Sequence, residues 1–373
     1  MVESLFYGRG MRWDSLRLDG EAPGPARGGH AGGAGGGAVP ALFERGAVTR
    51  TFATPEFRGM TFYEIHARSV INRVPGSSRL PFSWTINPYR GCSHACFYCF
   101  ARSTHTYLDL DAGQDFDSRI VVKVNAPQVV RRELAAPGWA GEHVAMGTNV
   151  DCYQRAEGRY QLMPGIIAAL RDAANPFSIL TKGTLILRDL DLLADAAQVT
   201  DVGLNVSVGI ADDELARSVE PGAPAPGRRL AVCAAISERG LNCGVLMGPV
   251  LPYLTDSPGQ LDAAVRQIAA AGAAHVTPIV LHLRPGAREW FLQWLAAEHP
   301  GLAEPYRRLY RSGAYAPADY QQAITAQVRE LAARYGVGQA SPAAARRLPA
   351  RARPRRGACG PASRPAGVQL TLM

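Results

Sequence analysis

From residue 84 onward, short runs of β-branched and apolar residues alternate with longer segments whose apolar residues recur at helical spacing. The runs predict six strands, at 84–88, 143–148, 177–182, 202–208, 243–250 and 275–283. The longer segments predict helices at 126–134, 162–173, 185–198, 226–240 and 257–272. Consecutive strands joined by such helices lie parallel in one sheet, because the crossovers are right-handed and pack back on the sheet. We therefore expect an α/β fold built as a partial (β/α)6 TIM-type barrel, since a complete barrel has eight units.

Both ends of the chain differ from this core. Two more helical segments, at 287–311 and 319–335, follow the last predicted strand and would cover an open edge or the floor of the barrel. Residues 20–40 are rich in Gly, Ala and Pro and cannot bury enough apolar surface to offset their ordering entropy. We predict a flexible N-terminal region at 1–60, a core at 61–286, a C-terminal helical extension at 287–336 and a disordered Arg/Pro-rich tail at 337–373.

The positive charge is concentrated in that tail. The 373 residues carry a formal net charge of +8, but residues 336–373 hold seven arginines and no acid, which leaves +1 for the rest of the chain. The charge alone therefore does not make the core a nucleic-acid-binding domain. No apolar run is long enough to cross a bilayer, and the first residues lack the order of a secretory signal. We expect a cytoplasmic protein without a membrane span.

Three of the seven cysteines, Cys92, Cys96 and Cys99, lie close together directly after the first predicted strand. Their C-x3-C-x2-C spacing lets three thiolates on one loop hold three irons of a cubane cluster and leave the fourth iron open for chemistry. One alternative is a zinc site completed by His94 or His105, and another is a chance grouping of buried cysteines. Zinc ligands usually come as two separated pairs, and no second pair follows here, so the spacing favours the iron-sulfur cluster.

With Tyr98 the loop reads C-x3-C-x-aromatic-C, and in this motif the chain resembles the radical SAM superfamily. The strings INPYRGCSHACFYCFAR (86–102), GTNVDCYQ (147–154), ILTKG (179–183) and SVEPGAPAPGRRL (218–230) resemble the branch around spore photoproduct lyase, a DNA-repair enzyme. The resemblance covers about residues 84–285 and makes 61–286 a radical SAM core. It implies a [4Fe-4S] cluster whose open iron binds S-adenosylmethionine (SAM), and an electron donor of the flavodoxin or ferredoxin type. Reductive cleavage of SAM would then yield a 5′-deoxyadenosyl radical that abstracts hydrogen from a substrate.

Polar residues at the ends of the predicted strands are candidates for binding SAM. Ligands bind where parallel strands end, and Thr148, Asn149, Lys182 and Ser207 all lie there. By similarity, Thr148 and Asn149 would meet the amino end of SAM, Lys182 its carboxylate, and Ser207 its ribose or carboxylate. Ordinary hydrogen bonding at strand ends is the alternative for the uncharged residues. Lys182 stands out because the chain has only two lysines.

The chain also departs from the lyase. That enzyme uses a cysteine immediately before its second-strand SAM ligand as hydrogen donor and a tyrosine pair around its third cluster cysteine, where this chain has Gly147 and, beside Tyr98, Phe100. Cys152 and Tyr153 could supply a thiol or phenol instead. The substrate is therefore unidentified, with nucleic acid as one candidate and a protein or a small metabolite as others. The alternative from another class is a metal-stabilised nucleic-acid-binding adaptor without turnover.

The last five residues form a separate candidate motif. Gln369, Leu370, Leu372 and Met373 resemble the peptide by which bacterial polymerases and repair proteins bind the sliding clamp, although Met373 stands where phenylalanine is usual. A disordered tether ending in an apolar anchor can bind a partner groove, and the preceding arginines could contact DNA phosphates. A chance match of five residues is the alternative.

Overall fold

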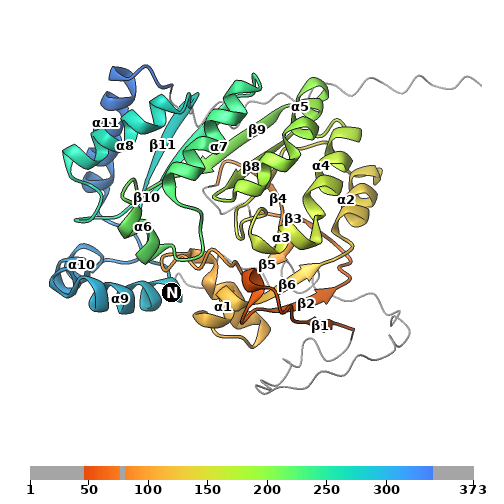
Figure 1. Ribbon diagram of the computed structural model, residues 1–373, viewed down its shortest axis with the longest axis horizontal. Helices are drawn as coiled ribbons and strands as arrows, with labels where there is room; N and C mark the ends of the chain where they lie inside the picture. Colours follow the sequence, from red (N-terminus) through yellow and green to blue (C-terminus); the bar gives the residue numbers. More distant parts are fainter. Residues whose placement is uncertain (1–45, 76–79, 339–373) are drawn as a thin grey trace, which may run out of the picture.

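A large sheet of seven strands forms the centre of the molecule. A computed structural model describes residues 46–75 and 80–338 (Figure 1). The strand order is β11-β10-β9-β8-β7-β4-β3, and the six strands from β4 to β11 run parallel. Their bounds are β4 Trp84–Ile86, β7 Val144–Met146, β8 Phe177–Thr181, β9 Val202–Ser207, β10 Cys243–Val250 and β11 His275–Val280, with β3 (Ile71–Arg73) added antiparallel to β4. The predicted α/β fold with a partial, open barrel is confirmed, because β3 and β11 form the two ends of the sheet and do not pair with each other.

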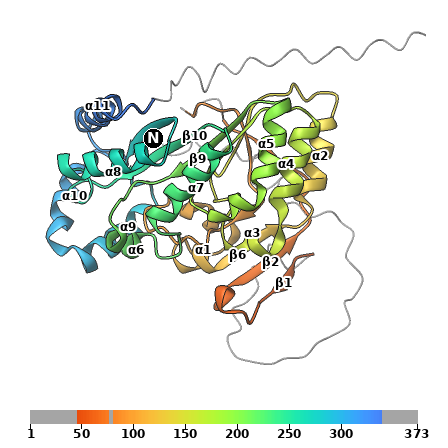
Figure 2. The same ribbon diagram turned by 45° about the horizontal axis from the view of Figure 1, so that its top comes forward.

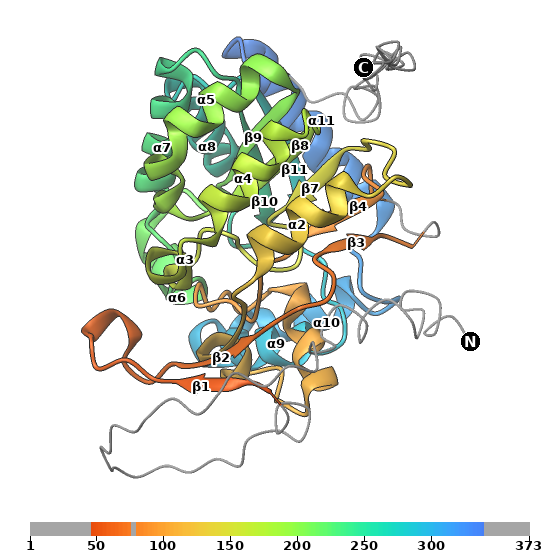
Figure 3. The same cartoon turned by 90° about the vertical axis from the view of Figure 1, so that its right-hand side faces the viewer.

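Helices cover one face of this sheet in the order of the strands (Figures 1 and 3). They are α2 Ala126–Ala135, α3 Arg155–Tyr160, α4 Leu162–Asp172, α5 Leu190–Val199, α7 Pro226–Glu238 and α8 Pro258–Ala270, with the short α6 at Asp213–Val219. The segment predicted as one helix at 185–198 is a 3-10 turn, η5 (Thr184–Asp189), followed by α5. Burial of each helix's apolar stripe against the sheet is what fixes this layer.

The C-terminal extension consists of α9 (Ala287–Glu298), η6 (Pro300–Leu302), α10 (Ala303–Leu309) and α11 (Ala318–Arg334). The segment at 287–311 is therefore two helices and not one, because Pro300 lacks the N–H that a continuing helix needs. Helix α11 packs against α8 and β11. Among the described helices, none is both long and apolar enough to span a membrane.

A second, smaller sheet was not predicted. It has the order β1-β2-β6-β5, with β1 at Val48–Arg50, β2 at Thr61–Ile65, β5 at Tyr89–Arg90 and β6 at Arg119–Lys123. Figure 2 shows β1 and β2 below the helical layer. Between them lies the turn η3 (Pro55–Phe57), where Phe52 packs against Phe57 and Phe62 with ring centroids 5.7 and 5.3 Å apart. Residues 48–60 therefore pack on the rest of the fold, because Phe57 and Phe62 are part of the large hydrophobic core and Phe52 packs against it.

Several predictions fall on residues outside the described ranges. The Gly/Ala/Pro stretch at 20–40, the Arg/Pro-rich tail beyond residue 338 and the clamp-binding residues Gln369, Leu370, Leu372 and Met373 all lie there. The last described residue, Gly338, pairs with His275 at the start of β11.

The buried carboxylate of Glu157 joins β5 of the small sheet to α4 and η5 in the helical layer of the large sheet. It accepts hydrogen bonds from the hydroxyl of Tyr89 (2.5 Å) and the guanidinium of Arg188 (2.7 Å), and from the backbone N–H groups of Leu162 and Met163, both at 3.1 Å. Burial raises the pKa of Glu157. The carboxylate therefore caps the first turn of α4 through the N–H groups of Leu162 and Met163, and it also anchors β5 through the hydroxyl of Tyr89.

Replacing this carboxylate should destabilise the fold. Glu157→Gln keeps the volume but puts an amide N–H₂ against groups that all donate, so we expect the free energy of unfolding to fall by about 2 to 3 kcal/mol. Urea unfolding followed by circular dichroism measures the change. Glu238→Gln, at an exposed carboxylate at the end of α7, is the matched control and should stay within about 0.5 kcal/mol. Equal stabilities of the two variants would contradict the role of Glu157.

Candidate active site

A cavity of about 210 Å³ lies where the parallel strands end. It gathers residues from the segment after β4 and from the ends of β7, β8, β9, β10 and β11. Every residue predicted to bind the cluster or SAM lines it: Cys92, Cys96, Tyr98, Cys99, Thr148, Asn149, Lys182 and Ser207. Apolar side chains form much of the remaining wall, among them Leu180, Leu246, Ile279 and Leu281.

The loop that carries the three cysteines is fixed on one side by Gln154. This side chain is fully buried, and its amide donates to the carbonyl of Gly91 (2.9 Å) while its oxygen accepts from the N–H of Ser93 (2.9 Å). The hydroxyl of Ser93 accepts in turn from the N–H of Arg155 at 3.3 Å. The start of α3 therefore sets the backbone of the residues on either side of Cys92.

The segment after α6 fixes the other side of the loop. The N–H of Gly222 donates to the carbonyl of His94 (3.1 Å), and the N–H of Phe97 donates to the carbonyl of Val219 (3.0 Å). A Cβ on Gly222 would lie 1.9 Å from the carbonyl oxygen of Ser93. Only glycine allows this approach of two backbones.

Helix α9 covers the loop from outside the barrel. The ring of Phe97 packs against Trp290 and Trp294 of this helix, with centroids 5.6 and 6.0 Å apart. Arg102, in the 3-10 helix η4 (Phe100–Leu108), donates from Nε to the carbonyl of Cys96 (3.0 Å) and pairs with Asp117 of α1 (Gln114–Ser118). The C-terminal extension thus stabilises the cysteine loop through α9, in addition to packing against β11 at the edge of the sheet through α11.

Asp151 connects the cysteine loop to the end of β8. Its carboxylate lies 3.3 Å from Nδ1 of His94 and accepts hydrogen bonds from the Thr181 hydroxyl and the Lys182 N–H, both at 2.6 Å. Burial by itself would raise the pKa of Asp151, but the contact with His94 and these donors outweigh it and hold the pKa at about 2. Sequence reasoning considered His94 only as a zinc ligand and did not identify Asp151.

Glu220 is the centre of a second buried network. Its carboxylate accepts hydrogen bonds from the Tyr98 hydroxyl and from Arg229. One carboxylate oxygen also lies 3.5 Å from Nζ of Lys182. Lys182 donates to the hydroxyl of Ser207 at 2.5 Å, so the ends of β8 and β9 are joined at the cavity wall. Burial lowers the pKa of Lys182 to about 8.

Comparison with known proteins identifies the family of this site. The family model described as the Radical SAM superfamily matches residues 86–262, which include the cysteine loop and the ends of β7, β8, β9 and β10 but not β11. The chain belongs to the radical SAM superfamily. It is therefore a radical SAM enzyme.

Relatives of known sequence span most of the chain. It is 53% identical to Rv2578c of Mycobacterium tuberculosis, named as an uncharacterized protein, over 299 residues that make up 80% of this chain and 88% of that protein. The uncharacterized protein MJ0683 of Methanocaldococcus jannaschii is 28% identical over 195 residues, 52% of this chain and 69% of that protein.

Solved structures of spore photoproduct lyase share the fold. A point mutant of that lyase matches with a TM-score of 0.57 and 16% identity, over 83% of this chain and 86% of the lyase. The lyase complexed with dinucleoside spore photoproduct matches with a TM-score of 0.52 and 17% identity, over 70% and 77% of the two chains.

The cavity has the polar groups that a radical SAM site needs. Burial raises the pKa values of Cys92, Cys96 and Cys99, so these thiols become ligands only when a metal centre displaces their protons. Within the described ranges, no three His, Cys, Asp or Glu side chains converge on a position for a single metal ion. The hydroxyl of Thr148 is buried and has no hydrogen-bond partner among the described residues. An unpaired buried hydroxyl in the cavity wall fits a polar ligand, because leaving such a group unsatisfied is costly.

One residue considered as a zinc ligand, His105, and the two proposed hydrogen donors, Cys152 and Tyr153, lie outside the cavity wall. His105 is not part of the cavity wall, and its Nε2 is hydrogen-bonded to the carbonyl of Arg119 at 2.9 Å. Cys152 and Tyr153 are buried behind the wall and do not line the cavity; the Tyr153 hydroxyl donates to Asp189 at 3.0 Å. Neither side chain therefore lines the cavity with the residues predicted to bind the cluster and SAM.

Gly147, which stands where the lyase has its cysteine, is required by the backbone. It has a φ of 79°, and a Cβ there would lie 1.8 Å from the carbonyl oxygen of Leu180. A cysteine at this position would displace β8, which leads directly into Lys182.

The backbone contact at Gly222 should be essential for binding the cluster. Gly222→Ala puts a methyl group into the Ser93 carbonyl, so we expect the cysteine loop to move and the iron content after anaerobic reconstitution to fall at least about tenfold, since something must shift by an ångström or more. Gly227→Ala, in the first turn of α7 with open space around its Cα, is the control and should keep its iron. Normal iron content in Gly222→Ala would show that the loop does not depend on this contact.

Proposed function

We propose that the cavity holds a [4Fe-4S] cluster through Cys92, Cys96 and Cys99 and binds SAM through Lys182, Ser207, Thr148, Asn149 and Tyr98. The observation that carries this proposal is the convergence of all these side chains on one cavity at the carboxyl ends of the strands. When bound, the two groups supply reductive cleavage of SAM and the abstraction of a hydrogen atom from substrate. The reaction class is that of a lyase-like or modifying enzyme.

The chain's own charges support carboxylate binding at Lys182. Glu220 is fully buried and is neutralised by Arg229, so the ammonium of Lys182 adds a positive charge to the cavity wall. The hydrogen bond from Lys182 to Ser207 holds the ammonium at the end of its strand. A carboxylate entering the cavity would make a charge-assisted hydrogen bond there.

Tyr98 and the apolar wall orient the ligand and exclude water. The hydroxyl of Tyr98 is held by Glu220, so its ring has a fixed place between the cysteines and Lys182, whose Nζ lies 5.8 Å from the ring centroid. Leu180, Leu246 and Ile279 leave few polar groups for bulk water. A dry site protects a reactive intermediate from side reactions.

For the substrate we propose nucleic acid, in a DNA-repair-like reaction that differs from that of the lyase. The exposed ring of Tyr315 packs on His282, which lines the cavity, with centroids 5.4 Å apart. An aromatic ring at the rim of a cavity is suited to stack a nucleobase. Gly147 and Phe100 exclude the lyase's own cysteine and tyrosine relay, and Cys152 or Tyr153 would need a rearrangement to replace it.

The proposed electron donor and cellular compartment follow from the needs of the cluster. An electron donor of the flavodoxin or ferredoxin type would reduce it, and a reducing, cytoplasmic compartment would preserve its thiolates.

Each of the three loop cysteines should be required for the cluster. Single alanine variants of Cys92, Cys96 and Cys99 should lose the broad visible absorption of the reconstituted protein and all formation of 5′-deoxyadenosine with dithionite, because each removes one iron ligand. Cys233→Ala, in the buried part of α7, is the matched control and should keep both. A full cluster in any of the three variants would overturn the assignment of that cysteine as an iron ligand. A colourless wild-type protein that binds one zinc would favour the adaptor without turnover.

Lys182→Ala should weaken the binding of SAM without loss of the cluster. A carboxylate–ammonium contact contributes about 1.5 to 3 kcal/mol, so we expect a ten- to hundredfold loss of affinity by calorimetry. Decarboxylated SAM is the matched ligand control: it should bind the wild type and the variant almost equally, because it lacks the group that Lys182 is proposed to bind. An equal loss for both ligands would mean that Lys182 shapes the cavity and does not bind the carboxylate.

A further inference from the structure

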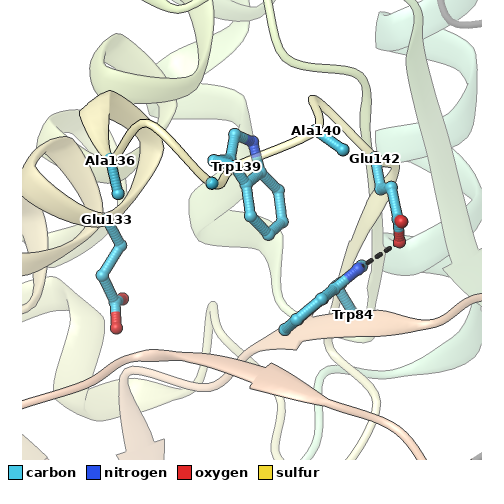
Figure 4. A pocket seen from close by; sticks show the side chains of 7 residues that line it. Trp84, Glu133, Ala136, Trp139, Ala140 and Glu142 are labelled. Carbon is cyan, nitrogen blue, oxygen red and sulfur yellow. Dashed lines mark hydrogen bonds between the residues drawn. The ribbon is translucent and has the colours of Figure 1, made fainter.

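A second cavity, of about 250 Å³, lies at the opposite end of the large sheet. Its wall includes Trp84, the first residue of β4, and Glu142, which stands two residues before β7, so it opens where the parallel strands begin. The other lining residues are Glu133, Ala136, Gly138, Trp139 and Ala140 (Figure 4). This cavity is therefore separate from the site proposed for catalysis.

Two indole rings line this cavity. Trp84 and Trp139 meet edge to face, with centroids 5.1 Å apart and planes at 69°. Both ring N–H groups are already used, since Trp84 donates to the carboxylate of Glu142 and Trp139 donates to Oδ1 of Asn175 at 2.7 Å. A ligand is therefore left with the π surface of the rings that this contact does not cover, and tryptophan is the best aromatic partner for a cation.

The walls are held in place by the protein itself. Asn175, which is 1% exposed, anchors the loop by donating to the carbonyl of Glu142 (3.1 Å) in addition to its bond with Trp139. On the other side, one oxygen of Glu133 accepts from the N–H groups of Val70 (3.0 Å) and Ile71 (2.9 Å). A site fixed in this way loses little entropy when a ligand binds.

Two carboxylates line the cavity, and the buried Lys123, which is not part of its wall, interacts electrostatically with Glu133 and partly compensates that carboxylate. Figure 4 shows the carboxylate of Glu133 on one side of the rings and that of Glu142 on the other. The second oxygen of each carboxylate, Oε1, makes no hydrogen bond within the described part of the chain, and none of the seven lining residues is basic. An organic cation would complement both the carboxylates and the indole rings.

We propose that this cavity binds a methylated ammonium cation. Methylation lowers the cost of dehydrating the cation and surrounds the charge with methyl groups that can pack on the indole rings, while the two carboxylates supply the opposite charge. The volume also suffices, since a cavity of roughly 150 Å³ already takes a guest the size of benzene. The proposal does not depend on the cluster or on SAM.

Titration of the reconstituted full-length protein with choline, followed by tryptophan fluorescence, tests this proposal. We expect a saturable response with a dissociation constant in the millimolar range, at least about tenfold lower than that of 3,3-dimethyl-1-butanol, which has the same shape but no charge. A peptide carrying trimethyllysine is the second arm: tighter binding than choline would make a modified protein side chain the source of the cation, and weaker binding a free metabolite. Equal binding of choline and the alcohol, or no saturable response up to about 100 mM choline, would overturn the proposal.

Two variants locate the site. Glu133→Gln keeps an oxygen for the N–H groups of Val70 and Ile71 but removes the charge. It should lower the affinity for choline about fivefold and change the affinity for the alcohol little. Trp139→Leu should lower the affinity for choline about tenfold. Glu298→Gln, at an exposed carboxylate of α9 far along the chain, is the matched control and should bind as the wild type does. Wild-type binding by Glu133→Gln would place the cation elsewhere.

Discussion

The proposed chemistry depends on holding an irregular loop in one conformation. Residues 91–99 must present three thiols to one cluster, and loops of this kind are ordinarily mobile. Here the backbone of the loop is hydrogen-bonded from both sides, by the side chain of Gln154 and by the backbone of 219–222. These anchors follow β7 and β9, so the sheet that positions the residues proposed to bind SAM also positions the cysteines. The proposed ligands of the cluster and of SAM therefore share one scaffold.

Charge balance then decides what the cavity attracts. The buried carboxylates of Asp151 and Glu220 each have a partner, His94 and Arg229, which is what makes their burial tolerable. Lys182 lies beside Glu220 but shares it with Arg229, so the group of three carries one positive charge at the wall. A ligand carboxylate is the natural complement, and the apolar remainder of the wall strengthens the attraction by keeping the local dielectric low.

The sequence predicted the parts of the molecule whose signal is local. Strand β10 was predicted with its observed bounds, 243–250, because it is a continuous apolar run, and the cysteine loop was recognised by its spacing alone. The small sheet was missed because β1 and β5 have only three and two residues, too few to show a period of two. Asp151 and Gln154 act through partners about 60 residues away, and no local pattern reveals such contacts. Residue chemistry singled out Cys152 and Tyr153, but chemistry alone does not say which way a side chain points.

The departure from the lyase has a structural cause that reaches beyond one residue. At Gly147 the chain passes so close to the carbonyl of Leu180 that no side chain fits, and the next residues of that strand are Thr181 and Lys182. Making room for a cysteine would move the strand end that binds Asp151 and carries the ammonium proposed to hold SAM. In this backbone a hydrogen donor at residue 147 and the observed place of Lys182 exclude each other. For the proposed chemistry, any hydrogen returned to a substrate radical would have to come from a group other than residue 147, and in this step we expect the reaction to differ from that of the lyase.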